Sequence, residues 1–238
     1  MSVRSAAEVG AALAGGADII DAKEPSRGSL GPVDRSVLRE IERRVPPAVP
    51  FSMALGDVEN GVDAAGEIGG LDLRSRPSGV FVKLGHARPP AIEAETSLRA
   101  AILAARTALS PFKVVLVAYA DRGATAGLVP REVVRLAARI QAHGVLLDTW
   151  SKDGGDLFAF MTPGQVKAWV EAARTAGLMP AVAGSLRAES LGSIREIDPD
   201  VVGVRGAACT GGREGTIDLE KVRTLRRTLD ALQPHPVR

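Results

Sequence analysis

The chain has 238 residues, of which 45% are hydrophobic, 24% are charged and 3% are aromatic. A chain of this length can bury a hydrophobic core without disulfide or metal support, and its formal charge of +2 argues against a strongly basic nucleic-acid-binding protein. The single cysteine, Cys209, excludes a disulfide framework and a cysteine-based zinc site. No stretch approaches the roughly 20 apolar residues of a membrane span. We therefore expect a cytoplasmic protein without a nucleic-acid or membrane partner.

Seven short apolar runs recur along the chain and predict strands that are buried on both faces. An eighth strand, the first in the chain, is predicted at 2–4. It is short, either because it is built from few residues or because the start of the chain has been placed too far downstream. The seven runs are 17–23, 49–56, 79–85, 113–121, 144–150, 179–185 and 200–206.

Helical periodicity separates these runs. Thr162 followed by Pro163 predicts a helix N-cap and the first residue of that helix, whereas Gly144 and Gly177 are predicted to follow helix ends. The segments with helical periodicity are 5–16, 32–45, 91–109, 130–144, 162–177 and 219–232.

Repeated strand–helix units at this length predict a (β/α)8 barrel of the TIM type with a short first strand, built as a single domain over residues 1–238. A doubly wound open sheet is the alternative architecture. It is disfavoured by the even spacing of the strands and by the lack of a GxGxxG turn after the first strand.

Only six of the 30 basic residues are lysines, and three of these six follow predicted strands, at Lys23, Lys83 and Lys152. The active site of a barrel lies at the carboxyl ends of its strands, so we expect the three lysines to converge there. A lysine that is partly desolvated near other cations has a lowered pKa. Its free amine can then attack a carbonyl and form a Schiff base. The alternative is that these lysines form ion pairs that only cap the barrel.

Carboxylates accompany two of the lysines. Asp21 lies two residues before Lys23, on the same face of the strand, and Asp148 lies four residues before Lys152. We predict that both carboxylates move protons during catalysis. Two further candidates stand at the end of the run 113–121, namely Tyr119 and Asp121.

Glycine-bearing turns end the last two predicted strands, at 181–186 and 203–209. Barrels often bind phosphate in these loops through backbone N–H groups, and an arginine can add a charge-assisted hydrogen bond. The alternative is that the glycines only allow tight turns. With three scattered histidines and one cysteine, no metal site is expected. The predicted phosphate-binding residues are Gly184, Ser185, Arg205, Gly206 and Ala207.

Five segments together resemble the (5-formylfuran-3-yl)methyl phosphate synthase family, also called the 4-(hydroxymethyl)-2-furancarboxaldehyde-phosphate synthase family. The resemblance covers almost the whole chain and implies a class I aldolase-like barrel. It implies a lyase that condenses two molecules of glyceraldehyde 3-phosphate into a phosphorylated furan aldehyde, with loss of phosphate and water and without a metal or organic cofactor. The product would supply the furan of methanofuran-type one-carbon carriers. The segments are GGADIIDAKEPSRGSLG (15–31), FVKLG (81–85), LLDTWSKDG (146–154), AGSL (183–186) and VGVRGAACTGG (202–212).

The resemblance also implies roles for the site residues. Lys23 matches the Schiff-base lysine, Asp21 its neighbouring carboxylate and Lys83 a second active-site lysine. Asp148 and Lys152 match the acid and the lysine that follow the sixth strand. The expected partners are a triose phosphate and further copies of the chain. The alternatives are another Schiff-base sugar-phosphate aldolase on the same barrel and a non-catalytic barrel that binds a phosphometabolite.

Overall fold

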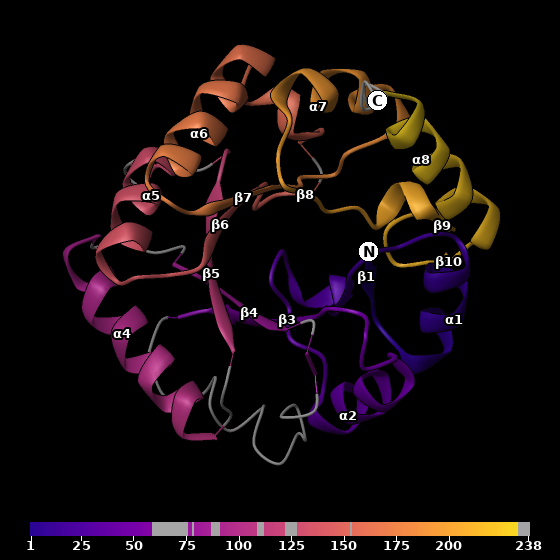
Figure 1. Cartoon of the computed structure of the whole chain (residues 1–238), viewed down its shortest axis with the longest axis horizontal. Coiled ribbons are helices and arrows are strands. Elements are labelled where there is room, and N and C mark those ends of the chain that lie inside the picture. The colour runs from indigo at the N-terminus through magenta and orange to yellow at the C-terminus, as the bar shows by residue number, and fades with distance from the viewer. Residues whose placement is uncertain are drawn as a thin grey trace.

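The computed structural model describes residues 1–58, 76–77, 79–86, 91–108, 112–121, 128–152 and 154–232. Eight parallel strands form one sheet in the order β1 to β8, and Figure 1 shows this sheet curled into a ring at the middle of the molecule. The expectation of a TIM-type barrel is confirmed, and the first strand is indeed short. The strands are β1 (Ser2–Val3), β2 (Ile20–Ala22), β3 (Phe51–Asp57), β4 (Val80–Gly85), β5 (Lys113–Tyr119), β6 (Gly144–Asp148), β7 (Met179–Val182) and β8 (Val201–Val202).

The helices surround this ring of strands (Figure 1). Each segment with helical periodicity contains a helix. The last residue of the segment 91–109 lies outside the described residues. One further helix, α7, was not predicted because it spans only about two turns. No described helix is long and apolar enough to cross a membrane. The helices are α1 (Ala6–Ala14), α2 (Arg35–Arg44), α4 (Ala91–Ala108), α5 (Pro130–Arg139), α6 (Pro163–Thr175), α7 (Leu191–Ile197) and α8 (Leu219–Leu232).

The predicted start and end of α6 are confirmed. The Thr162 hydroxyl accepts a hydrogen bond from the backbone N–H of Gln165 at 3.3 Å, and the Gln165 side chain accepts one from the Thr162 N–H at 2.8 Å. This reciprocal pair satisfies two backbone donors that the helix itself leaves unpaired. Beyond the other end of α6, Gly177 has a φ of +74°.

The prediction that Gly144 follows a helix end is wrong. Gln141, with a φ of +55°, takes the left-handed position after α5, and Gly144 begins β6. A glycine is needed at 144 for a different reason: a Cβ there would lie 2.6 Å from the carbonyl oxygen of Met179. Close approach of β6 and β7 therefore explains this glycine.

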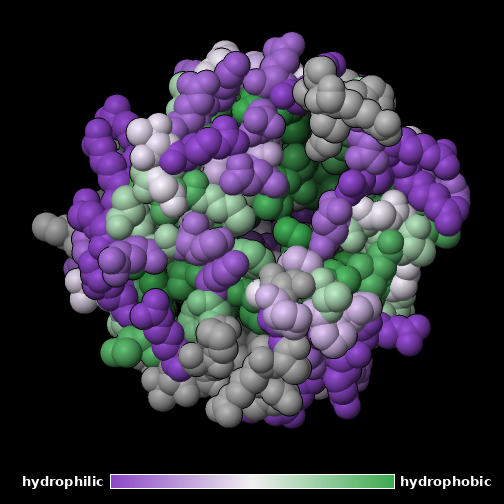
Figure 2. Space-filling model, viewed as in Figure 1, coloured by the Kyte–Doolittle hydropathy of each residue, from purple (hydrophilic) through white to green (hydrophobic). Residues whose placement is uncertain are grey.

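Alternation along the strands divides the buried side chains into two layers. One layer, which includes Ile20, Val82 and Leu147, packs against the helices. A smaller cluster lies inside the barrel and includes Val115 and Ala181. On the face shown in Figure 2, hydrophilic side chains project around the rim and hydrophobic ones gather toward the middle.

A buried ion pair closes the ring where its last strand meets its first. The Ser2 backbone N–H donates to the Val204 carbonyl at 3.2 Å. The guanidinium of Arg205 donates to both carboxylate oxygens of Glu8, at 2.9 and 3.1 Å, and to the Ser2 carbonyl at 3.1 Å. Both Arg205 and Glu8 are buried. Helix α1, strand β1 and the segment after β8 are thus joined by one side chain.

The same guanidinium holds a short antiparallel hairpin of β9 (Cys209–Thr210) and β10 (Thr216–Ile217). Its Nε donates to the Arg213 carbonyl at 2.8 Å and its Nη2 to the Gly215 carbonyl at 2.9 Å. The Gly211–Gly212 pair, with φ values of +84° and +75°, forms the turn of this hairpin.

We predict that Arg205→Ala lowers the free energy of unfolding by about 3–5 kcal/mol, because it leaves the Glu8 carboxylate buried without its cation. Urea unfolding followed by circular dichroism measures the change. Arg195→Ala, at an exposed position on α7, is the control and should change stability by no more than about 0.5 kcal/mol. Equal stability of the two variants would contradict the role given to this ion pair.

Candidate active site

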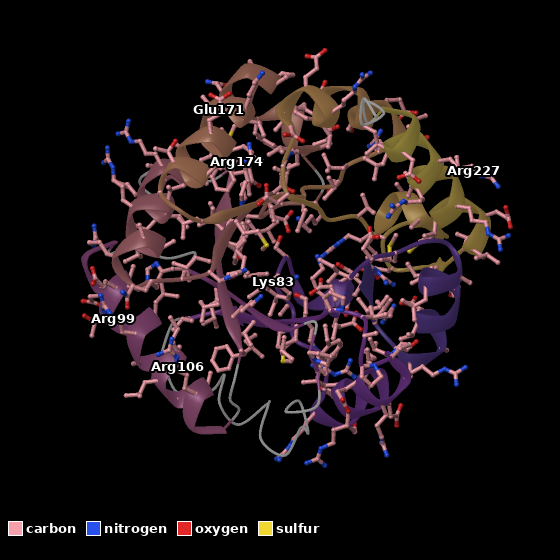
Figure 3. The ribbon with its side chains drawn as sticks, viewed as in Figure 1. Lys83, Arg99, Arg106, Glu171, Arg174 and Arg227 are labelled. Carbon is pink, nitrogen blue, oxygen red and sulfur yellow. The ribbon has the colours of Figure 1, made fainter. Side chains whose placement is uncertain are left out.

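The five residues predicted for catalysis line one cavity inside the barrel. Its volume is about 430 Å³. The residues lie on β2, β4 and β6 or follow these strands within four residues, so they converge from separate strands. Figure 3 shows Lys83 at the middle of the ring, whereas Arg99 and Arg227 lie on its outer rim. The five residues predicted for catalysis are Asp21, Lys23, Lys83, Asp148 and Lys152.

Lys83 forms an ion pair with Asp21 across the intervening strand β3. The Lys83 ammonium donates to Asp21 Oδ2 at 2.7 Å, and the Ser2 hydroxyl donates to the same oxygen at 2.7 Å. Ser52, which lines the cavity, and Ala54, in the inner cluster, are the small side chains of β3 between the two strands, so Lys83 can reach from β4 to β2. Asp21 lies two residues before Lys23 in the sequence, but its ion pair in the structure is with Lys83.

The other carboxylate oxygen of Asp21, Oδ1, is buried and has no hydrogen-bond partner among the described residues. Burial raises the pKa of Asp21, but the charges of Lys83 and Lys23 and the hydrogen bonds from Lys83 and Ser2 outweigh it, so the pKa is lowered overall. Asp21 is therefore ionised at neutral pH. Its Oδ1 is an available proton acceptor at the cavity wall.

Lys152 forms the second ion pair. Its ammonium donates to Asp148 Oδ1 at 2.7 Å, to the Thr149 hydroxyl at 3.1 Å and to the Thr149 carbonyl. The Thr149 backbone N–H donates to the same Asp148 oxygen at 2.7 Å. Burial raises the pKa of Asp148, but the charges of Lys152 and Lys23 and these hydrogen bonds lower it overall. The expected pairing of Asp148 with Lys152 is present.

Lys23 differs from the other two lysines because its amine forms no hydrogen bond with the described residues. It is buried, with 9% of its surface exposed. Burial lowers its pKa from the ordinary 10.5 to about 8; Lys83 and Lys152 also lower it, while Asp148 and Asp21 raise it. At pH 7 about a tenth of the side chain is then a free amine. Lys23 has the properties of a nucleophile.

Asp121 and Ser29 hold the backbone of the loop that carries Lys152. The two carboxylate oxygens of Asp121 accept hydrogen bonds from the backbone N–H groups of Trp150 and Ser151, at 2.6 and 2.7 Å. The Ser29 hydroxyl donates to the Thr149 carbonyl at 2.5 Å. Asp121, a candidate for proton transfer from the sequence, is thus engaged with loop backbone.

Tyr119, the other candidate at the end of β5, donates its hydroxyl to the Asp57 carboxylate at 2.9 Å. Its ring packs edge-to-face against Trp150, with ring centroids 5.2 Å apart. Gly85 makes this contact possible, because a Cβ there would clash with the Asp57 carboxylate and lie 2.8 Å from the Tyr119 hydroxyl. Tyr119 does not line the cavity with the lysines.

The turns after β7 and β8 present backbone N–H groups. Those of Gly184, Ser185, Gly206 and Ala207 form no hydrogen bond with any described residue. Gly184 has a φ of +105°, and a Cβ there would lie 3.1 Å from the Thr149 methyl group. Gly184 and Ser185 line the same cavity as the lysines. These turns therefore have donors that an anion can use.

The expectation that Arg205 binds phosphate conflicts with its hydrogen bonds. Its guanidinium has five N–H groups, and five hydrogen bonds to protein acceptors account for all of them. Sequence reasoning missed this because Glu8 lies 197 positions away. Arg205 closes the barrel, and we do not include it among phosphate ligands.

The sequence reasoning also missed Ser2, Thr149 and Arg213. Ser2 and Arg213 line the cavity, and Thr149 binds Lys152. In the sequence, a hydroxyl beside a strand end or a single arginine in a loop gives no pattern that marks it as part of a site. Among the described residues, no three His, Cys, Asp or Glu side chains gather as metal ligands.

Comparison with known proteins identifies close relatives over nearly the whole chain. A model of the family described as 4-HFC-P synthase matches residues 1–226. The chain is 37% identical over 225 residues to the (5-formylfuran-3-yl)methyl phosphate synthase of Methanothermobacter thermautotrophicus, covering 92% of this chain and 93% of the relative. It is also 37% identical over 222 residues to the protein of the same name from Methanopyrus kandleri, covering 92% of each chain.

Solved structures with low sequence identity share the fold. The 3-hexulose-6-phosphate synthase of Salmonella typhimurium superposes with a TM-score of 0.64 at 16% identity, covering 98% of both chains. The phosphoribosyl anthranilate isomerase of Thermus thermophilus gives a TM-score of 0.57 at 16% identity, covering 97% of this chain and 96% of the other. At this identity the likeness concerns the barrel alone.

We predict that Lys23 reacts with amine reagents at lower pH than an exposed lysine. Only the unprotonated amine reacts, so the labelling rate of Lys23 should rise with pH and level off above about pH 8. A model lysine peptide added to the same reaction should continue to gain reactivity up to about pH 10.4. Competitive labelling with isotopic formaldehyde and cyanoborohydride, read by peptide mass spectrometry, measures both profiles. Identical profiles for the two lysines would refute the lowered pKa.

Proposed function

The chain belongs to the 4-HFC-P synthase family, and we propose that it condenses two molecules of glyceraldehyde 3-phosphate into (5-formylfuran-3-yl)methyl phosphate. The reaction serves the furan part of methanofuran-type one-carbon carriers. The observation that carries the proposed chemistry is Lys23: a buried amine without a hydrogen bond to the described residues and with a pKa of about 8. Such an amine adds to an aldehyde at neutral pH.

Lys23 opens the reaction by adding to the aldehyde carbon of one triose phosphate. Water leaves, one proton is taken up, and a protonated imine remains. Asp148 and Lys152, which interact electrostatically with Lys23, shuttle the proton that this step consumes. The positive imine then draws electrons from the neighbouring carbon, which makes the hydrogen on that carbon acidic.

Asp21 takes this hydrogen as a proton. Its Oδ1 is buried, ionised and without a hydrogen bond to the described residues, and its Oδ2 is held by Lys83 and Ser2. A carboxylate fixed through one oxygen and open at the other is suited to general base catalysis. Removal of the proton converts the imine to an enamine, which is the carbon nucleophile.

The enamine attacks the aldehyde of the second triose phosphate and forms the new carbon–carbon bond. Lys83 and Lys152 polarise the accepting oxygen or neutralise phosphate charge. Phosphate is then lost, and a substrate hydroxyl adds to the imine carbon to close the ring, with departure of Lys23 as the free amine. Over the whole reaction the two substrates lose one phosphate and two molecules of water, and the formation of an aromatic furan favours completion.

One substrate phosphate is assigned to the turns after β7 and β8. The available N–H groups of Gly184, Ser185, Gly206 and Ala207 support this assignment, since barrels commonly bind phosphate at these loops. With the phosphate there, the three-carbon chain extends toward Lys23, which lines the same cavity as Gly184 and Ser185.

The test is incubation of the purified protein with glyceraldehyde 3-phosphate alone. The expected result is ultraviolet absorbance of a furan aldehyde together with release of inorganic phosphate. A reversible aldol product without phosphate release would identify another sugar-phosphate aldolase. Binding without any product would identify a non-catalytic phosphometabolite-binding barrel.

A variant pair links this activity to the cavity. Lys83→Met removes the cation that holds Asp21, and we expect furan formation to slow by at least about 100-fold. Lys167→Met changes the same residue type on the outer surface and should leave the rate within about twofold. Equal rates in the two variants would remove Lys83 from the proposed mechanism.

A further inference from the structure

The turns after β7 and β8 lack the cation that the sequence assigned to them. A phosphate monoester carries a charge of about −1.5 to −2 at neutral pH, and arginine is the side chain best suited to bind it in a planar, bidentate fashion. Arg205 cannot serve, because all five of its N–H groups bind protein acceptors. A different arginine at the same cavity would supply this cation at the turns.

Among the residues that the structure describes, three arginines line the cavity: Arg205, Arg213 and Arg226. Arg226 lies at the other end of the barrel. It pairs with Asp18 at 2.5 Å, and Asp18 precedes β2 and therefore stands at the amino end of the strands. Arg213 stands on the carboxyl side, in the hairpin that follows β8.

The backbone of Arg213 packs against one of the proposed phosphate donors. The point where a Cβ would stand on Gly206 lies 3.7 Å from the Cβ of Arg213 and 3.8 Å from its Cα. The Gly206 N–H forms no hydrogen bond with a described residue. Arg213 therefore borders the turn after β8 and lines the same cavity as Gly184 and Ser185 of the turn after β7.

Two arginine side chains bind the backbone of the turn that carries Arg213. Arg205 binds the carbonyls of Arg213 and Gly215, and Arg4 binds the carbonyl of Glu214 at 2.8 Å. Three consecutive carbonyls of the turn are thus fixed by two arginines. A side chain on a fixed backbone loses less conformational freedom when it binds a ligand.

Arg213 also contacts the loop that follows Lys23. Its Nη2 donates to the Gly28 carbonyl at 2.8 Å. The next residue, Ser29, binds the Thr149 carbonyl, which also accepts a hydrogen bond from Lys152. Hydrogen bonds therefore connect Arg213 to the loops that carry Lys23 and Lys152.

We infer that Arg213 binds the phosphate of a triose phosphate at the turns after β7 and β8 and makes the enzyme selective for phosphorylated aldehydes. This role rests on the proposed function for its substrate, but the binding of phosphate itself is measurable without turnover. The ligand class is a phosphate monoester, and inorganic phosphate is the probe.

The first test is titration of wild type, Arg213→Gln and Arg227→Gln with inorganic phosphate by calorimetry. Arg227, exposed on α8, points away from the ring (Figure 3) and is the control. We expect Arg213→Gln to weaken phosphate binding by at least about tenfold, the lower end for a hydrogen bond to a charged group, and Arg227→Gln to leave it within about twofold. Equal affinity of all three proteins would overturn the inference.

The second test uses the wild-type protein, so it does not depend on a variant that folds. Phenylglyoxal modifies accessible guanidinium groups, and peptide mass spectrometry reports each site. Inorganic phosphate should protect Arg213 and leave Arg227 unprotected. Modification of Arg213 at the same rate with and without phosphate would overturn the inference.

Turnover separates this inference from the proposed function. If furan forms and Arg213→Gln has the wild-type KM for glyceraldehyde 3-phosphate, the role of Arg213 is wrong and the function stands. If no furan forms but phosphate binding depends on Arg213, the phosphate site stands and the proposed reaction is wrong.

Discussion

The chemistry of the cavity depends on one constraint: Lys23 is buried among charges, yet both nearby carboxylates are held by other lysines. Asp21 is paired with Lys83 and Asp148 with Lys152, each at 2.7 Å. If either carboxylate bound Lys23 directly, the ion pair would stabilise the ammonium form and raise its pKa. Because each is already paired, burial prevails and the pKa of Lys23 falls to about 8.

The scaffold imposes this arrangement through distant parts of the chain. Small side chains on the inner face of β3, Ser52 and Ala54, let Lys83 reach across to β2. Asp121 and Ser29 fix the loop that brings Lys152 back to Asp148. The environment of Lys23 thus depends on the closed barrel, because the residues that form it come from distant segments of the chain.

Closure of the ring of strands also depends on residues that lie far apart in the sequence. The first strand has only two residues, so few backbone hydrogen bonds are available where it meets the last strand. The buried pair of Arg205 and Glu8 supplies side-chain bonds at that junction and also carries the hairpin with Arg213. Stability and the proposed phosphate site therefore share one guanidinium.

Much of the fold was predictable because strand alternation and helical periodicity are local properties of the sequence. They placed the three lysines at strand ends and showed which side chains share a face. The ion pairs between side chains were harder to predict from the sequence. Asp148 and Lys152, four residues apart, were anticipated as neighbours, whereas the bond between Asp21 and Lys83 crosses a whole strand and depends on the small size of two residues between them.

Other features were missed for comparable reasons. Helix α7 and the β9–β10 hairpin are too short to produce a periodic pattern. Arg205 follows a strand and is flanked by glycine, as a phosphate ligand would be, and nothing near it in sequence indicates that Glu8 occupies it. The identity of an arginine's partner is a property of the closed ring, so Arg213 emerged only from the three-dimensional arrangement.

The most direct measurement is reduction with borohydride in the presence of glyceraldehyde 3-phosphate, followed by peptide mass spectrometry. The predicted result is a stable adduct on Lys23, absent without substrate and absent in the Lys23→Arg variant, because a guanidinium stays protonated and cannot form the imine. An adduct on Lys83 or Lys152 in place of Lys23, or no adduct under conditions of turnover, would contradict the assignment of Lys23 as the nucleophile.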